Sequence, residues 1–425
     1  MAAMLLCCSA VRADLSVPVR QPQSVTAGKV LTLADCIDLA LKNQASIRQA
    51  MAQVEVQAGA VSQARSKLLP GTSVSGSTDL AGSANQNSGT TVTAGASQLI
   101  FDFSRTPSQI REAERARLAA TETLKGTSAN VILSVKQAYY TLLQDIHLVD
   151  VFTENLKDQQ GHVAQAQARK DAGMAPLTDV LTAQTAEASA RLDLVTAKNN
   201  ADQARVNLNA AMGINVLSPI QIAEGTEPET PPLPEDQAVQ VAFSKRPEIR
   251  ADAYQIMASQ AAVKVASTGN LPALTTSAER SHSTVSSASG QNDSWQWTLN
   301  LVWTPIDFGS TSGAVRSAKA QVVSAEETLY NDKQTIAGQV VQARLGVLAA
   351  EEQLREATAE VASAKATLDS VTGSYQAGVA IFLQVLDAQS AMLKAEVDEF
   401  SARYGLSIAR ATLEHAMGGT VKEGV

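Results

Sequence analysis

The sequence predicts a mainly α-helical protein with a small β part, built from two copies of one unit. Two stretches are alike: Arg169–Gln184 (RKDAGMAPLTDVLTAQ) and Tyr375–Gln389 (YQAGVAIFLQVLDAQ), with Gly173 and Gly378 205 positions apart (378 − 173). Hydrophobic residues make up 45 % of the chain but aromatic residues only 4 %. Such a composition favours long helices with narrow alanine-rich contacts over a thick core.

Composition and charge exclude several classes of function. The 425 residues include 34 basic and 42 acidic side chains, and no basic stripe is present, so nucleic acid is not an expected partner. The chain has no phosphate-binding glycine loop and no nucleophile elbow. Its four histidines share no metal-ligand spacing, so we predict no enzyme activity, metal or cofactor; they are His147, His162, His282 and His415.

Residues 1–13 resemble the remainder of a secretory signal peptide. Met4–Ala10 is a short apolar run, and the following residues 11–13 (VRA) resemble a small-residue cleavage site. The basic region that normally comes first is missing, which leaves the true start of the chain open. Residues 14–30 are expected to form an extended N-terminal segment.

The three cysteines predict no intrachain disulfide. Cys7 and Cys8 lie in the apolar run, so only Cys36 remains after cleavage. Neither Cys7 nor Cys8 follows the small residue that a lipid-attachment site prefers, so lipidation is the less favoured alternative. No apolar run reaches the ~18 residues of a membrane-spanning helix.

The first repeat is expected over residues 31–213. Thr32 is a candidate N-cap. Leu69-Pro70 ends the first helix, and a Gly/Ser/Thr-rich stretch then predicts two strands. The expected parts, in order, are a helix over Leu31–Leu69, a strand pair at about 71–103, a helix over Ser104–Ala172, a turn at Gly173, and a return helix from Pro176 to Met212. At 1.5 Å per residue the long helix spans roughly 100 Å.

The second repeat is expected over residues 236–418, after a proline-rich extended linker over 214–235. Leu271-Pro272 ends its first helix as Leu69-Pro70 does, and residues 306–309 (IDFG) match residues 101–104 (FDFS). The expected parts are a helix over Glu235–Asn270, a strand pair at about 273–308, a helix over Ser310–Gln376, a return helix over Ala380–Gly418, and a tail over 419–425.

A strict heptad pattern runs along the second long helix. Its apolar residues alternate at spacings of four and three, which predicts a left-handed coiled coil. They are Ile336, Val340, Ala343, Val347, Ala350, Leu354, Ala357, Val361, Ala364, Leu368, Val371 and Tyr375. The first repeat has the same rhythm, interrupted by Asp145. Taken alone, this pattern favours a stalk or adaptor.

The segment Trp295–Thr304 (WQWTLNLVWT) alternates with period two. Its odd positions are Trp295, Trp297, Leu299, Leu301 and Trp303, so all three tryptophans of the chain lie on one face, at both ends of an apolar centre. This pattern is typical of a membrane β-strand with aromatic girdles and a polar lumen side. A half-buried strand of a soluble sheet is the alternative, but too few other strands are expected to build one.

Four strands per chain predict assembly. A sheet in a bilayer has to close, because unpaired edges cannot be satisfied in lipid. Two chains would give eight strands, and an eight-stranded barrel is filled by its own side chains. Three chains would give twelve strands around an open lumen, so we expect a homotrimer in contact with outer-membrane lipid.

Together these residues resemble the TolC family of outer-membrane export channels. The resemblance covers about Leu31 to Gly418 and depends on the duplication, the Leu-Pro helix ends, the matching FDF and IDF segments and the paired turns. It implies a trimer with a 12-stranded transmembrane barrel on a tapering periplasmic barrel of coiled helices. An adaptor protein and an inner-membrane pump of the RND, ABC or MFS class would drive substrates through this duct.

The resemblance also implies where function lies. The two turns would form the periplasmic end, with adaptor-docking residues Gly173, Val180, Leu181, Gly378, Val385 and Leu386. The family's gate positions correspond to Tyr375, Asp179 and Asp387. Gln384 stands where the family has a carboxylate and Ala380 where it has an arginine, so a complete charge lock is in doubt.

Each gate residue also has a simpler interpretation. Asp179 and Asp387 lie near helix N-termini, which favour any carboxylate. Tyr375 is also the last residue of the heptad pattern. The leading hypothesis is a passive outer-membrane exit duct of a tripartite efflux or type I secretion system. The alternative is a periplasmic coiled-coil scaffold or adaptor without a pore.

Overall fold

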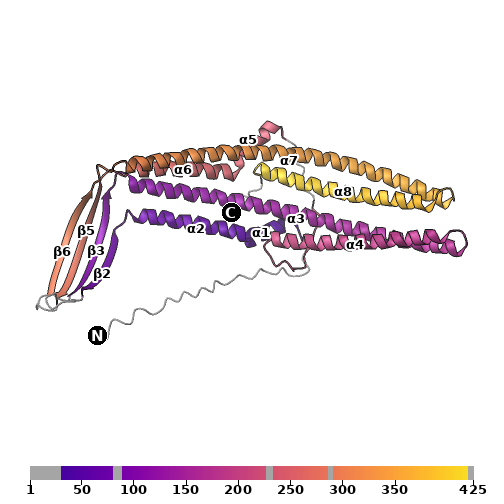
Figure 1. Ribbon diagram of the computed structural model, residues 1–425, viewed down its shortest axis with the longest axis horizontal. Coiled ribbons are helices and arrows are strands. Elements are labelled where there is room, and N and C mark those ends of the chain that lie inside the picture. The colour runs from indigo at the N-terminus through magenta and orange to yellow at the C-terminus, as the bar shows by residue number, and fades with distance from the viewer. Residues whose placement is uncertain (1–29, 80–88, 226–232, 286–290, 420–425) are drawn as a thin grey trace, which may run out of the picture.

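The protein is a long, narrow bundle of helices with a small sheet at one end, as the computed structural model shows (Figure 1). The structure describes residues 30–79, 89–225, 233–285 and 291–419. The expected signal remnant, the extended segment 14–29 and the tail from residue 420 lie outside these residues. The helical turns lie at the end opposite the sheet, so the molecule has two distinct ends (Figure 1).

The helices and strands occur in two similar sets. The first set is β1 (Val30–Leu31), α1 (Leu33–Asn43), α2 (Ala45–Ser66), β2 (Gly71–Asp79), β3 (Gly89–Phe101), α3 (Arg105–Asp171), α4 (Leu177–Ala211) and β4 (Gln221–Ile222). The second set is α5 (Glu235–Lys245), α6 (Pro247–Ser267), β5 (Ala273–Val285), β6 (Gln291–Val302), α7 (Ser310–Gln376) and α8 (Phe382–Ala416).

Two 67-residue helices, α3 and α7, form the length of the molecule. Helices α2 and α4 lie one after the other along α3, and α6 and α8 do the same along α7 (Figure 1). An aspartate shortly before each long helix accepts a backbone N–H of the first helical turn. Asp102 Oδ2 accepts the Thr106 N–H at 2.6 Å, and Asp307 Oδ2 accepts the Thr311 N–H at 2.7 Å. This contact explains why the aspartate recurs in the FDF and IDF segments.

The heptad pattern is the packed face of α7. Every residue of that pattern is buried or half-buried. Helices α5, α7 and α8 share one apolar cluster built on these residues. Asp145 interrupts the corresponding face of α3, and burial raises the pKa of its carboxyl group. The heptad pattern therefore correctly predicts the packed face of α7, and the left-handed supercoil stays a prediction.

The expected single helix over Leu31–Leu69 is wrong, because the chain forms two helices there. Thr32 is the N-cap of α1, with its hydroxyl accepting the Asp35 N–H at 3.2 Å. The chain then leaves helical geometry at Gln44, whose side chain donates to the carbonyls of Ala210 and Ala211 at 3.4 and 3.1 Å. Gln44 thus caps the C-terminal end of α4, and this long-range contact replaces helical continuity at the junction.

The expected helix over Glu235–Asn270 is also two helices, α5 and α6. The break falls at Arg246, directly before Pro247, where a proline disfavours helical geometry. Arg246 Nη1 donates to the His415 carbonyl at 3.2 Å, at the C-terminal end of α8. Arg246 thus links the α5–α6 junction to the C-terminal end of α8, as Gln44 links the α1–α2 junction to the C-terminal end of α4.

Residues 216–217 of the expected extended linker form a turn, and Leu31 lies in a strand and not in a helix. Strand β1 pairs in parallel with β4 of the linker, with Leu31 beside Ile222. Leu31 is 1 % exposed and belongs to the main apolar cluster between α1, α3 and α4. Leu31 directly precedes the apolar pattern of α1 in the sequence, so the sequence alone does not separate this strand residue from the helix that follows.

Gly213, at the end of α4, packs directly on the junction between α1 and α2. Its φ is +68°, and a Cβ atom there would lie 2.9 Å from the Asn43 carbonyl carbon. Gly173 has a similar φ of +72° but nothing within 4 Å of its would-be Cβ. Substitution at Gly173 therefore tests backbone strain alone, whereas substitution at Gly213 adds a steric conflict.

We expect Gly213→Ala to lower the free energy of unfolding by about 3 kcal/mol, and Gly173→Ala by only about 1–2 kcal/mol. Both variants place a side chain on a left-handed residue, but only Gly213→Ala also forces the α1–α2 junction apart. Urea denaturation followed by helical circular dichroism measures both values. Equal losses for the two variants would contradict the close packing of Gly213.

The four long strands form one antiparallel sheet in the order β2-β3-β5-β6. Both edges, β2 and β6, lack a neighbouring strand within the described part of the chain. The inner strands β3 and β5 come from different repeats and pair along most of their length. The sheet therefore joins the two repeats at one end of the molecule.

Among the residues that the structure describes, no helix combines the length and the apolar character needed to cross a membrane.

Candidate functional site at the paired helical turns

The two repeated stretches form turns with the same backbone geometry. After α3, the Met174 N–H donates to the Arg169 carbonyl at 2.8 Å, and Gly173 is left-handed. After α7, the Val379 N–H donates to the Ser374 carbonyl at 2.9 Å, and Gly378 has a φ of +77°. This is the Schellman pattern, in which glycine avoids a steric penalty at the left-handed position.

The two turns pack against each other through a small apolar cluster, here called the tip cluster. Helices α3, α4, α7 and α8 all contribute to it. Its buried members are Ala166, Val180, Ala183, Tyr375, Phe382, Val385 and Leu386. The tip cluster makes the two hairpin ends one packed unit, which lies at the end of the molecule farthest from the sheet (Figure 1).

Tyr375 lies at the centre of the contact between the two hairpins. The Arg169 guanidinium carbon lies 4.3 Å from the centroid of its ring, a cation–π arrangement. The Phe382 ring lies 5.8 Å away, centroid to centroid. Tyr375 is 9 % exposed, and no hydrogen bond of its hydroxyl is found among the described residues. Its ring therefore joins α3 to α7 and α8, while its hydroxyl has no described acceptor.

Sequence reasoning missed Arg169, Phe382 and His162 as parts of this site. His162 Nε2 lies 2.6 Å from Gln389 Nε2, and Gln159 Nε2 donates to Gln389 Oε1 at 3.1 Å. Gln389 belongs to the repeated turn motif, and this repetition was the one sequence feature that could have marked Gln389 as a contact residue. Its partners on α3 lie more than 220 positions earlier in the chain, so spacing alone could not reveal them.

Two of the predicted gate residues, Gln384 and Asp387, line a shallow groove between α7 and α8. The groove has a volume of about 550 Å³, and its walls also include Ser374, Val379 and Ala380. Asp387 is exposed and has no ion pair within the described ranges. Its carboxylate is therefore free to meet a group from outside this protomer.

Gln384 has a structural role that the sequence did not reveal. Its Oε1 accepts the Ile381 N–H at 3.3 Å, which caps the first turn of α8. The Gln384 side chain therefore already has a partner within its own helix. We therefore regard Gln384 mainly as a helix cap, in contrast to Asp387 beside it.

Asp179 lies in the first turn of α4 and is half-buried. Its backbone N–H donates to the Pro176 carbonyl at 3.2 Å, and its carboxylate makes no ion pair within the described residues. Asp179 does not line the groove that contains Asp387. The protomer alone therefore does not bring the two predicted gate carboxylates into one site.

The predicted docking residues divide into buried and exposed ones. Val180, Val385 and Leu386 are 3 %, 1 % and 9 % exposed, so their side chains hold the tip cluster together and are closed to a partner. Leu181 is 52 % exposed. The other large apolar side chains exposed around the turns are Met174, Leu177, Val379, Ile381 and Leu383.

At the opposite end, the sheet has one apolar and one polar face. Trp295, Trp297 and Trp303 are 80 %, 66 % and 59 % exposed. The first two lie on strand β6, and Trp303 follows its last residue. The polar face includes the residues Ser73, Ser75, Ser77, Thr91, Thr93, Gly95, Ser97, Ser277, Glu279, Ser281, Ser283, Ser294, Gln296 and Thr298. Glu279 is the one charged residue among these fourteen.

Within the described parts of the chain, no group of three or more His, Cys, Asp or Glu residues is placed to hold a metal ion. The buried Cys36 has a pKa raised to about 12 by burial and by the nearby Asp35, so its thiol is not a reactive thiolate.

Comparisons with known proteins agree with this geometry. Residues 36–214 and 238–419 match the model of the outer membrane efflux protein family. The outer membrane efflux protein BepC of Brucella suis is 26 % identical over 91 % of this chain and 85 % of its own length. The outer membrane protein TolC of Escherichia coli is 22 % identical over 88 % of this chain and 79 % of its own.

The fold is also that of a solved channel. The crystal structure of the CmeC outer membrane channel from Campylobacter jejuni superposes with a TM-score of 0.82 over 97 % of this chain and 92 % of that one, at 18 % sequence identity. At this level of identity the similarity concerns the fold alone.

Proposed function

This chain belongs to the outer membrane efflux protein family, and from that premise we propose that it forms the exit duct of a tripartite efflux or type I secretion system. The duct lies in the outer membrane and extends into the periplasm, like the channels it resembles. It conducts substrates passively and performs no chemistry of its own. The observation that carries the proposal is the two-faced sheet at one end of long helices whose packed turns form the other end.

The dimensions of the sheet support a position in the bilayer. Trp295 and Trp303 are eight residues apart, ~27 Å along a strand and ~20 Å in height at the usual tilt. The apolar band of outer-membrane strands is about 25 Å tall between its aromatic girdles. Leu299 and Leu301 lie between these tryptophans and are 58 % and 62 % exposed. The apolar face therefore fits lipid and the polar face fits a lumen.

Three copies complete the sheet. The edges β2 and β6 each need a partner strand, and a 12-stranded closed barrel provides one to every copy. Exposed apolar side chains on the outer faces of α4 and α7 support the same assembly, because helices of neighbouring copies would cover them; they are Leu192, Val195, Val206, Val323, Tyr330, Leu345 and Leu348.

The tip is the end that meets the partners. We place the adaptor contact on the exposed apolar side chains of the turns, among them Leu181, Val379 and Ile381, and the pump beyond the adaptor. Tyr375, Asp179 and Asp387 form the gate, with polar contacts that each copy makes to its neighbours. The pump class, RND, ABC or MFS, is not specified by these residues.

Planar-bilayer recording of the purified trimer tests the duct. We expect stepwise conductance from the wild-type protein. Replacing Trp295, Trp297 and Trp303 together with serine is expected to remove most of the protein from the membrane fraction, because the aromatic girdles are lost.

The matched control changes the opposite face of the same strand, with Gln296, Thr298 and Asn300 replaced by serine. This variant should stay in the membrane and conduct. A wild-type protein that is monomeric and silent, with a triple tryptophan variant that fractionates unchanged, would instead support the periplasmic scaffold.

A further inference from the structure

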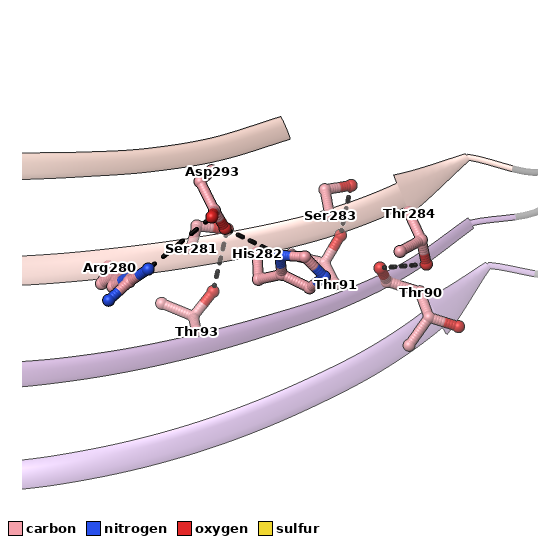
Figure 2. Close-up of polar contacts among 9 residues, drawn as sticks. All are labelled: Thr90, Thr91, Thr93, Arg280, Ser281, His282, Ser283, Thr284 and Asp293. Atoms are coloured by element: carbon pink, nitrogen blue, oxygen red, sulfur yellow. Dashed lines mark hydrogen bonds and ion pairs between the residues drawn. The ribbon is translucent and has the colours of Figure 1, made fainter. Parts of the chain in front are cut away.

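The outer end of the sheet carries a charged cluster on its tryptophan-bearing face. Arg280 and His282 alternate on β5, and Asp293 lies opposite His282 on β6. His282 Nδ1 lies 2.7 Å from Asp293 Oδ1, and Arg280 Nη2 lies 3.6 Å from Asp293 Oδ2. Figure 2 shows the two basic side chains on either side of the carboxylate.

Strand register places Arg280 level with the outer tryptophan of the girdle and the His282–Asp293 pair directly beyond it. Arg280 pairs with Trp295, and Ala278 pairs with Trp297. The His282–Asp293 pair lies two residues farther toward the strand ends, ~7 Å along the strand. The cluster therefore lies on the lipid-facing side, at the level where headgroups follow the apolar band.

The opposite face near this level carries the single carboxylate of Glu279 and, around it, hydroxyl groups. Thr91 contacts Ser283 at 3.2 Å, and Thr93 donates to Ser281 at 3.5 Å (Figure 2). Arg280, His282 and Asp293 themselves lie on the lipid side of the sheet and not on the lumen side. Charged side chains on the lipid face are tolerated at the interface but are costly at the midplane. Charged side chains on this face are therefore stable where they contact polar groups of the lipid headgroup layer.

The arrangement favours an anionic group. Asp293 uses one oxygen for His282 and directs the other toward Arg280, which orients both basic side chains. The Arg280 side chain is 74 % exposed, and its closest described partner is beyond hydrogen-bond distance. A planar guanidinium with free N–H groups is well suited to bind phosphate in a bidentate manner.

We propose that Arg280 and His282, oriented by Asp293, bind the phosphate of an anionic lipid headgroup in the outer leaflet, one site for each copy of the chain. This inference rests on the proposed membrane position of the sheet. Glu279, one residue away but on the lumen face, provides a natural control because it carries a charge that no lipid can reach.

The test uses the full-length trimer in phosphatidylcholine nanodiscs that contain a small fraction of a bis-phosphorylated glycolipid. A second set contains the same glycolipid with its phosphates removed. Native mass spectrometry counts the glycolipid molecules retained per trimer. We expect the wild type to retain the phosphorylated form at least about tenfold more strongly than R280Q/H282Q, which loses its charge-assisted contacts.

E279Q should retain the phosphorylated lipid like the wild type. R280K keeps the charge and should retain more of the phosphorylated lipid than R280Q. This difference between two variants of the same residue would separate loss of binding from loss of the fold. Equal retention by wild type and R280Q/H282Q, or equal retention of the dephosphorylated lipid, overturns the proposal. Inhibition of lipid retention by millimolar inorganic phosphate alone would also overturn it, since the site would then bind free phosphate. Failure of the wild type to enter nanodiscs would contradict the proposed duct itself.

Discussion

Replacing Arg246 with methionine is expected to lower the free energy of unfolding by about 3 kcal/mol or more, the range for breaking a buried ionic contact. The Arg246 side chain is 7 % exposed, and its guanidinium joins three elements. Nη1 donates to the His415 carbonyl on α8, Nη2 donates to Gln339 Oε1 on α7 at 2.7 Å, and Nε lies 3.3 Å from Glu248 Oε2 on α6. Methionine has similar length but supplies none of these donors.

Urea denaturation of the detergent-solubilised protein measures this loss. Gln44→Met is the matched control, because Gln44 caps α4 at the equivalent junction of the first repeat but carries no charge. We expect it to cost only about 1 kcal/mol, the usual value of a neutral hydrogen bond. A loss below that of Gln44→Met would contradict the assigned role of Arg246.

The same variant has a second readout at His415. Burial and the charge of Arg246 lower the pKa of this histidine. Removal of Arg246 therefore should raise the His415 pKa, since a nearby positive charge disfavours the imidazolium form. Titration by NMR detects the change and separates a local electrostatic effect from general destabilisation.

Much of the fold could be predicted from local signals. The paired glycines at 173 and 378 require left-handed geometry, so they mark the ends of the long helices. The alternation of Trp295, Trp297 and Trp303 identified a strand with one apolar face, because successive side chains of a strand point to opposite sides. The heptad spacing identified the packed face of α7. Each of these patterns is set by residues close together in the chain.

The features that were missed depend on contacts between distant residues. Gln44 ends one helix because its side chain reaches Ala210 and Ala211, and nothing local announces it. At Arg246 the following proline was a local signal that could have indicated the break. The cation–π contact of Arg169 with Tyr375 joins positions 206 apart (375 − 169), so only the folded hairpins reveal it.

The polar gate residues are expected to control conductance without holding the protomer together. The Tyr375 hydroxyl and the Asp387 carboxylate have no described partner within their own protomer, whereas the Tyr375 ring is packed against Arg169 and Phe382. In the proposed trimer, Tyr375→Phe with Asp387→Ala would therefore remove the polar contacts to neighbouring copies and keep the tip cluster. Two contacts of ~0.5–1 kcal/mol in each of three copies amount to ~3 kcal/mol or more, which shifts a closed-to-open ratio by about a hundredfold.

Single-channel recording of the double variant should therefore show a larger conductance or open fraction than the wild type, with an unchanged free energy of unfolding. Gln384→Ala is the control, because Gln384 caps α8 through the Ile381 N–H. Its loss should cost stability on the order of 1 kcal/mol and leave conductance unchanged. If Gln384→Ala opened the channel as strongly as the double variant, the gate would depend on order in the first turn of α8. If neither variant changed conductance, closure would depend on the apolar packing of Tyr375 and Phe382 alone.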